Sequence, residues 1–227
     1  MSGRQPATVV AVTACVGFDL DMTLIDPRPG MAEAMNTLAA ESGLPFDGEH
    51  FAANLGAPLE HVLREFGAPE DRLPALVARF RQTYPDLVIP RTVALPGAGE
   101  ALAAVRGAGA RTLVVTGKYA PNAQRHVRAL GWTVDRLVGG LWSTAKATAL
   151  TEHRASVYVG DHVGDIRGAL AAGAVAVGVA TGPCPRDELL AAGAHVVLDS
   201  LTEFPRWFAA HGERGAITPG DAPGPAR

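Results

Sequence analysis

The stretch Phe-Asp-Leu-Asp-Met-Thr-Leu, residues 18–24, carries the strongest signal in this chain. Asp19 and Asp21 follow apolar runs at residues 9–12 and 15–18, which predict a buried strand. Residues i and i+2 of a strand point to the same side, so the two carboxylates should lie together. Such a pair is costly unless a cation such as a hard divalent metal joins it. A strand that merely ends in a polar turn is the alternative.

Length and composition narrow the class of protein. A chain of 227 residues can form one large domain or a domain with an insertion, and 48% apolar residues allow a sizeable core. The net charge of −3 argues against a nucleic-acid-binding stripe or a polybasic membrane patch. Cys15 and Cys184 indicate buried thiols in a reducing compartment rather than a disulfide framework.

The first residues do not read as a secretion signal, because cleavage would destroy the strand that leads to Asp19. No apolar stretch approaches the roughly 20 residues that cross a bilayer. We therefore expect a cytoplasmic protein without membrane or nucleic-acid partners.

A helix-only segment interrupts the chain after residue 24. Helical spacing and helix-ending glycines predict helices at 30–43, 48–54, 59–66 and 72–84. We expect this insertion, residues 29–92, to form a helical subdomain with proline-containing hinges at 26–29 and 85–95. Residues 1–28 and 93–211 would form the main domain, and residues 212–227 a disordered tail rich in Gly and Pro.

From residue 96 onward, strands and helices alternate. The predicted strands are 111–116, 136–138, 156–159, 175–179 and 195–198, separated by helices at 98–107, 120–130, 144–153, 163–172 and 186–192, with a final helix around 204–208. This alternation predicts an α/β fold: a doubly wound parallel sheet covered on both faces.

Ligands of such sheets bind beyond the carboxyl ends of the strands, and polar residues collect there. Four predicted strand ends carry Asp19 and Asp21, then Thr116, Gly117 and Lys118, then Lys146, and finally Asp161 and Asp165. This is the set that phosphoryl transfer requires: acids for a metal and a nucleophile, with a hydroxyl, amides and a lysine for the phosphate.

The use of lysine is unusual. Eighteen of the twenty basic residues are arginine, and the two lysines are Lys118 and Lys146. Lysine is a compact point charge whereas arginine is a planar fork, so a tight site that accepts only the former is one explanation and chance is the other.

Taken together, these motifs resemble the haloacid dehalogenase superfamily, over roughly residues 13–200. Its phosphatases carry, in order, the pattern seen here as Asp19/Asp21/Thr23, Thr116, Lys146 and Asp161/Asp165. The helical insertion resembles the family's α-helical cap. The sequences around Gly56 (residues 55–59) and at residues 95–97 resemble the phosphoglycolate phosphatase branch.

The resemblance implies specific roles. Asp19 would attack phosphorus, and Asp21 would protonate the leaving oxygen and then activate water. Thr116 and Lys146 would stabilise the phosphoryl group. Mg²⁺ would be held by Asp19, the Asp21 carbonyl, Asp161 and, through water, Asp165. Substrate contacts are expected from Thr23, Gly56, Gly117 and Lys118.

An acid at Asp21 favours a phosphatase or mutase over a dehalogenase, because an alkoxide leaving group needs a proton. Met22 stands where relatives usually have Gly, and it could crowd the loop that leads to the cap. We expect a Mg²⁺-dependent phosphatase, monomeric or homodimeric, acting on a small phosphorylated metabolite, with 2-phosphoglycolate as the first candidate. A mutase of the β-phosphoglucomutase type and a non-catalytic binding protein are the alternatives.

Overall fold

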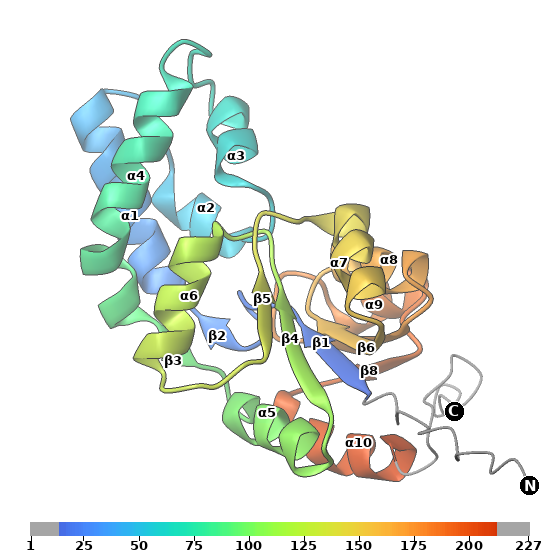
Figure 1. Ribbon diagram of the computed structural model, residues 1–227. Helices are drawn as coiled ribbons and strands as arrows, with labels where there is room; N and C mark the ends of the chain where they lie inside the picture. Colours follow the sequence, from blue (N-terminus) through green and yellow to red (C-terminus); the bar gives the residue numbers. More distant parts are fainter. Residues whose placement is uncertain (1–13, 213–227) are drawn as a thin grey trace, which may run out of the picture.

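A computed structural model describes residues 14–212 (Figure 1). The predicted strand segment 9–12 and the tail from residue 213 lie outside the described residues. Within the described part of the chain, no helix combines the length and apolarity needed to cross a bilayer.

A six-stranded sheet forms the centre of the molecule. Its strand order is β5-β4-β1-β6-β7-β8, and every neighbouring pair is parallel. The strands are β1 (Cys15–Phe18), β4 (Arg111–Val115), β5 (Arg136–Val138), β6 (Ala155–Gly160), β7 (Val175–Val179) and β8 (Val196–Leu198). The predicted doubly wound α/β fold is therefore confirmed.

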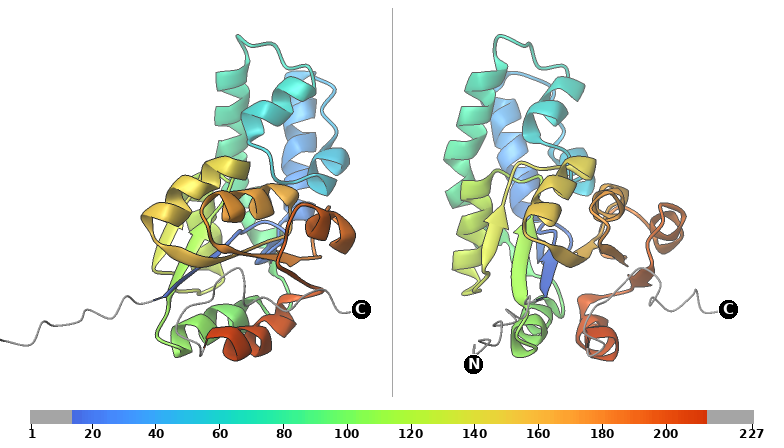
Figure 2. Two further views of the ribbon diagram at one scale, coloured as in Figure 1. Left: turned by 90° about the vertical axis from the view of Figure 1, so that its right-hand side faces the viewer. Right: turned by 45° about the vertical axis from the view of Figure 1, so that its right-hand side comes forward.

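Helices cover both faces of this sheet because its strands are apolar on both sides. On β4, Val114 packs into one apolar cluster, while Leu113 and Val115 pack into another on the opposite face. The first cluster includes residues of α5 (Ala98–Gly107), α6 (Ala120–Ala129) and α10 (Phe204–Gly212); the second includes residues of α7 (Lys146–Glu152), α8 (Val163–Ala171) and α9 (Arg186–Ala191). Figure 2 shows α5 and α10 on the side of the sheet opposite α7 and α8.

The helical insertion has its own apolar core, so we call it the cap. It consists of α1 (Arg28–Ser42), α2 (Gly48–Ala53), α3 (Leu59–Glu65) and α4 (Leu73–Leu87), and it lies above the carboxyl end of the sheet in Figure 1. Met35, Leu38, Leu63 and Phe80 are among the residues that pack in its core. The inserted helical subdomain expected from the sequence is thus present.

The hinge regions differ from the expectation in two respects. Helix α4 continues through Pro85 to Leu87 instead of ending at Tyr84, because Tyr84 and Val88 are buried in the cap core and hold the last turn in place. The sequence analysis also missed a short antiparallel ribbon, in which β2 (Ile25–Asp26) pairs with β3 (Val93–Ala94). This ribbon joins the two chain segments that enter and leave the cap.

Candidate active site

Three adjacent strands deliver polar residues to one edge of the sheet. β4, β1 and β6 are neighbours, so Thr116, Asp19 and Asp161, which follow their last residues, meet beyond the carboxyl ends. The amide of Asp19 donates to the carbonyl of Val159 over 2.8 Å, which fixes this residue against the neighbouring strand. The cap closes over this edge and leaves a cavity of about 310 Å³.

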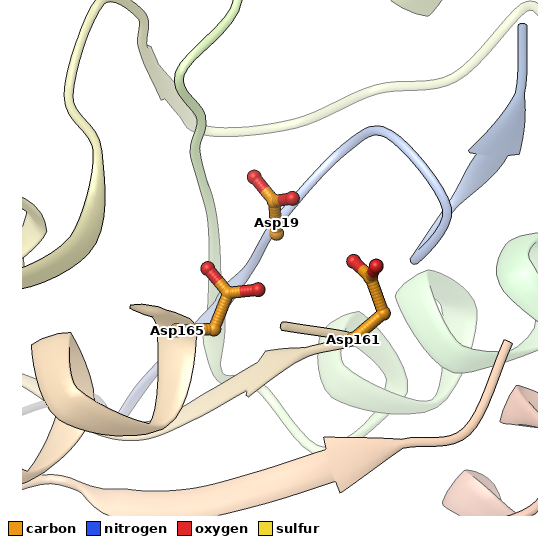
Figure 3. A group of neighbouring side chains, drawn as sticks. All are labelled: Asp19, Asp161 and Asp165. Atoms are coloured by element: carbon orange, nitrogen blue, oxygen red, sulfur yellow. The ribbon is translucent and has the colours of Figure 1, made fainter. Parts of the chain in front are cut away.

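Three buried carboxylates form the centre of the site. One oxygen from each of Asp19, Asp161 and Asp165 lies within 4.8 Å of the others, and Figure 3 shows the three groups gathered around a common space. Asp165 comes from the first turn of α8, and its Oδ2 accepts a hydrogen bond from the amide of His162 over 3.1 Å. The carboxylates at positions 19 and 161 are therefore close enough to share one cation.

Lys146 lies against this cluster from the start of α7. Its Nζ is 2.8 Å from Asp19 Oδ1 and 2.6 Å from Asp165 Oδ1, and it donates to the Tyr158 hydroxyl over 3.0 Å. Tyr158 in turn donates to the carbonyl of Val115 over 2.6 Å. The ammonium is thus held by three oxygens at a fixed place beside Asp19.

The electrostatics of the cluster favour a further cation. Burial, together with the Asp165 charge, raises the pKa of Asp19 to about 7 in spite of Lys146. Burial and the charges of Asp165 and Asp19 likewise raise the pKa of Asp161 well above its usual range. One lysine does not balance three acids, so the cluster carries excess negative charge in its ionised form.

A hard divalent cation fits this cluster. The donors are carboxylate oxygens, which are the ligands that hard divalent cations prefer. The chain also packs tightly behind them: a Cβ on Gly182 would lie 1.8 Å from Asp161 Oδ2, so only glycine fits there. Asp19, Asp161 and Asp165 would supply the side-chain ligands.

The side chain of Asp21 is not part of the three-carboxylate cluster. Its Oδ2 lies 3.0 Å from Nζ of Lys118, whose side chain is only 4% exposed. Its Oδ1 is buried and has no hydrogen-bond partner among the described residues, although Asp21 lines the cavity. Asp21 is therefore an acid at the cavity wall with one oxygen that no other described residue occupies.

Three other residues that were predicted for the site, Thr116, Gly56 and Gly117, line the cavity. Thr116 is 1% exposed and lines the cavity, and its hydroxyl accepts from the Lys118 amide over 3.2 Å. Gly56 and Gly117 also line the cavity, and a Cβ on Gly117 would lie 2.6 Å from the Gly56 carbonyl oxygen. Cap and core therefore meet backbone to backbone at this point.

Thr23 is the exception. It is fully buried and is not among the residues that line the cavity. Its hydroxyl donates to Asp161 Oδ1 over 2.8 Å. This contact makes Thr23 a support for a carboxylate of the cluster, and its expected contact with substrate stays a prediction without structural support.

Both lysines of the chain lie in this site, each against an aspartate of the Asp19/Asp21 pair. The unusual distribution of lysine thus coincides with the place where a compact charge is needed. Each ammonium group is packed among oxygen atoms that a planar guanidinium would not match.

Three residues around these lysines are not predicted from the sequence: Tyr158 and Tyr84 each contact a lysine, and His126 contacts Tyr84. Tyr158 reads as an ordinary strand residue, and Tyr84 as a helix residue of the cap. His126 lies on α6, and its Nε2 is 2.7 Å from the Tyr84 hydroxyl. These residues reach the site only through long-range packing, for which the sequence carries no local signal.

The chain is similar in sequence to known hydrolases and phosphatases. The family model "Haloacid dehalogenase-like hydrolase" matches residues 16–179. The chain is 30% identical over 205 residues to a probable phosphatase, IndB, of Dickeya dadantii, covering 82% of this chain and 89% of that protein. It is 32% identical over 213 residues to a phosphoglycolate phosphatase of Caulobacter vibrioides, covering 85% and 90% of the two chains.

A similar fold occurs in a solved structure, that of a predicted phosphatase from Clostridium acetobutylicum. The TM-score is 0.76 at 21% identity, and the match covers 87% of this chain and 99% of the other. At this level of identity the likeness concerns the fold alone.

Proposed function

This chain belongs to the haloacid dehalogenase-like hydrolase family, in its phosphoglycolate phosphatase-like branch, and we propose that it hydrolyses a small phosphate monoester with the help of Mg²⁺. The observation that carries the proposal is the meeting of Asp19, Asp161 and Asp165 within 4.8 Å, with Lys146 beside them. This arrangement combines a nucleophile with oxygen ligands for a cation.

Asp19 is the proposed nucleophile. It lines the cavity, and it is held by a backbone hydrogen bond to β6 and by Lys146. One of its carboxylate oxygens would attack phosphorus, the bond from phosphorus to the leaving oxygen would break, and an aspartyl phosphate would form. Water would then attack phosphorus, the bond to Asp19 would break, and inorganic phosphate would leave.

Asp21 is the proposed acid and base of both steps. Asp21 lines the same cavity as Asp19, its Oδ1 has no partner among the described residues, and Lys118 contacts its other oxygen. It would donate a proton to the leaving oxygen in the first step and take one from the attacking water in the second. A proton from water thus replaces the one that left with the alcohol, and Asp21 is again protonated at the end of each cycle.

Charge on the phosphoryl group requires positive partners. Lys146 and the hydroxyl of Thr116 would bind phosphoryl oxygens from the core side. Mg²⁺ held by Asp19, the Asp21 carbonyl, Asp161 and Asp165 would offset the excess negative charge and polarise a phosphoryl oxygen. The overlying cap would exclude bulk water, which strengthens each of these interactions.

Phosphate release by the wild type and by Asp19→Asn, with and without EDTA, tests the proposal. We expect release from at least one metabolite of a phosphate-ester panel, loss of at least about a thousandfold in Asp19→Asn, and loss with EDTA that Mg²⁺ restores. Equal rates for the two proteins, or no release from any compound of the panel, would favour a binding protein instead.

Three finer points belong to the same proposal. 2-Phosphoglycolate is the first compound to assay, because the Caulobacter vibrioides relative carries the name phosphoglycolate phosphatase. Isomerisation of glucose 1-phosphate without release of inorganic phosphate would identify a mutase. A reducing, cytoplasmic location is proposed from Cys15 and Cys184, which are buried free thiols.

A further inference from the structure

The cavity under the cap is larger than a two-carbon acid needs. Its volume of about 310 Å³ falls in the range of pockets that enclose drug-sized ligands. The phosphoryl site described above occupies only the end formed by the core strands. The rest of the cavity is therefore available to the leaving group of the substrate.

The cap side of this cavity is apolar and aromatic. Phe51, Leu55, Leu59 and Phe80 line it from three cap helices and the loop between them. The ring centroids of Phe51 and Phe80 are 5.9 Å apart in an edge-to-face arrangement, and Tyr84 continues this wall. A surface of this kind binds apolar rings by area burial and ring packing.

Two exposed aromatic side chains from the core lie at the same cavity. Tyr119 is 43% exposed and Trp142 is 37% exposed, and both line the cavity from loops that follow β4 and β5. Large exposed apolar groups around a concave site typically mark a surface that a ligand covers. Trp142 also lies beside the cap, with its ring 6.1 Å from that of His61.

The charges that line the cavity disfavour a second anionic group on the substrate. Among the described residues, five acids line it against Arg81, Lys118 and Lys146. Lys146 contacts Asp19 and Asp165, and Arg81 Nη2 is 2.9 Å from Glu60. Each of these cations is therefore already paired with an acid of the protein.

Lys118 is the cation that would bind a carboxylate of the substrate, but other protein groups already contact its ammonium group. Its Nζ contacts Asp21 over 3.0 Å and the Tyr84 hydroxyl over 2.6 Å, and its third neighbour is Met31 Sδ at 4.0 Å. An ammonium group has three donors, so a substrate carboxylate would have to displace one of these partners. An uncharged leaving group carries no such cost.

We propose that the natural substrate is a phosphate monoester whose leaving group is uncharged and carries an aromatic ring, bound between the cap wall and the side chains of Tyr119 and Trp142. The proposal rests on the proposed phosphatase function and narrows its substrate class. The two-carbon acid 2-phosphoglycolate then serves as the reference compound.

Four probes separate the effects of ring and charge: ethyl phosphate, benzyl phosphate, 4-carboxybenzyl phosphate and 2-phosphoglycolate. Ethyl and benzyl phosphate both release a primary alcohol and differ by the ring. We expect kcat/KM for benzyl phosphate to exceed the values for ethyl phosphate and 2-phosphoglycolate by about tenfold or more. The added carboxylate should remove most of this gain. A preference for 2-phosphoglycolate, or equal rates with and without the ring carboxylate, would overturn the proposal.

Calorimetric binding of the same probes to Asp19→Asn, with Mg²⁺ present, keeps this test independent of turnover. The expected order of affinity is the same, with benzyl phosphate first. If the wild type releases no phosphate but the order of affinity holds, the ring site stands and the phosphatase function fails. Equal affinities for ethyl and benzyl phosphate would overturn the ring site whatever the activity.

Trp142→Ala locates the ring. We expect the ratio of kcat/KM for benzyl phosphate over ethyl phosphate to fall by about three- to tenfold. Leu170→Ala is the matched control, because Leu170 is 41% exposed on α8 and does not line the cavity. This control should keep the wild-type ratio. An unchanged ratio in Trp142→Ala would contradict the proposed position of the ring.

Discussion

The ammonium group of Lys118 donates a hydrogen bond to the hydroxyl of Tyr84 over 2.6 Å. Lys118 follows β4 of the core, and Tyr84 lies on α4 of the cap. Because Lys118 also contacts Asp21, the cap reaches the proposed acid and base through a single side chain. A movement of the cap that displaces Tyr84 would therefore also change the position of the Lys118 ammonium group beside Asp21.

His126 completes this chain of contacts and sets its direction. A lysine can only donate, so the Tyr84 hydroxyl accepts from Lys118 and donates its own hydrogen bond to Nε2 of His126, 2.7 Å away. Nε2 must then be unprotonated. In agreement, burial and the nearby charge of Lys118 lower the pKa of His126 to about 3.

Tyr84→Phe should destabilise the protein by about 1–3 kcal/mol, because it leaves two buried partners, Lys118 and His126, each short of a hydrogen bond. Denaturant unfolding measures this loss. Tyr119→Phe is the matched control, since Tyr119 is 43% exposed, and its change should stay within about 0.5 kcal/mol. Similar losses of unfolding free energy in the two variants would show that the hydrogen bonds of the Tyr84 hydroxyl do not stabilise the protein.

His126→Gln should change how stability depends on pH. The unfolded chain binds a proton at His126 near pH 6.5, whereas the folded protein does so only at about 3, so wild-type stability falls as pH decreases through this window. From pH 6.5 to 5 this loss amounts to about 2 kcal/mol, and the variant lacks it. Unfolding free energies of both proteins across this range should converge or cross; parallel curves would contradict the neutral, buried state of His126.

Lys146→Arg should lower kcat by about a hundredfold or more. The Lys146 nitrogen contacts Asp19, Asp165 and Tyr158 at once, and a planar guanidinium cannot place one nitrogen among these three oxygens. Steady-state kinetics with any accepted phosphate ester measures the effect. The control is Arg79→Lys, at an exposed pair with Glu41, which should keep kcat within about twofold. A kcat for Lys146→Arg within tenfold of the wild type would show that charge alone suffices.

The sheet and the residues at its edge could be predicted because parallel strands are buried on both faces and appear as apolar runs. The bounds of β5 and β7 agree with the predicted ranges 136–138 and 175–179. Asp19, Thr116 and Asp161 follow such runs directly, so their common location follows from topology alone. The boundary of the cap at residues 29–92 stays a prediction.

What could not be predicted depends on contacts between distant segments. β2 and β3 have two residues each, too few to show a strand pattern, and their pairing joins segments on either side of the cap. Tyr84 and Tyr158 carry no local sign of their contacts with the lysines, nor does His126 of its contact with Tyr84. The backbone conformation of Met22 is likewise not predictable from the sequence: this residue has a left-handed φ of 59° and is 3% exposed. Glycine adopts this φ without strain, whereas methionine adopts it only at a cost.

Calorimetric titration of Mg²⁺ tests the central claim most directly, because it measures whether the three carboxylates share a cation without depending on substrate. The wild type should bind one ion per chain. Asp161→Asn, which keeps the shape of the side chain, should weaken this affinity by at least about tenfold, whereas Asp199→Asn at the exposed surface should not. Equal Mg²⁺ affinity in the wild type and Asp161→Asn would contradict the metal centre on which the proposed phosphatase depends.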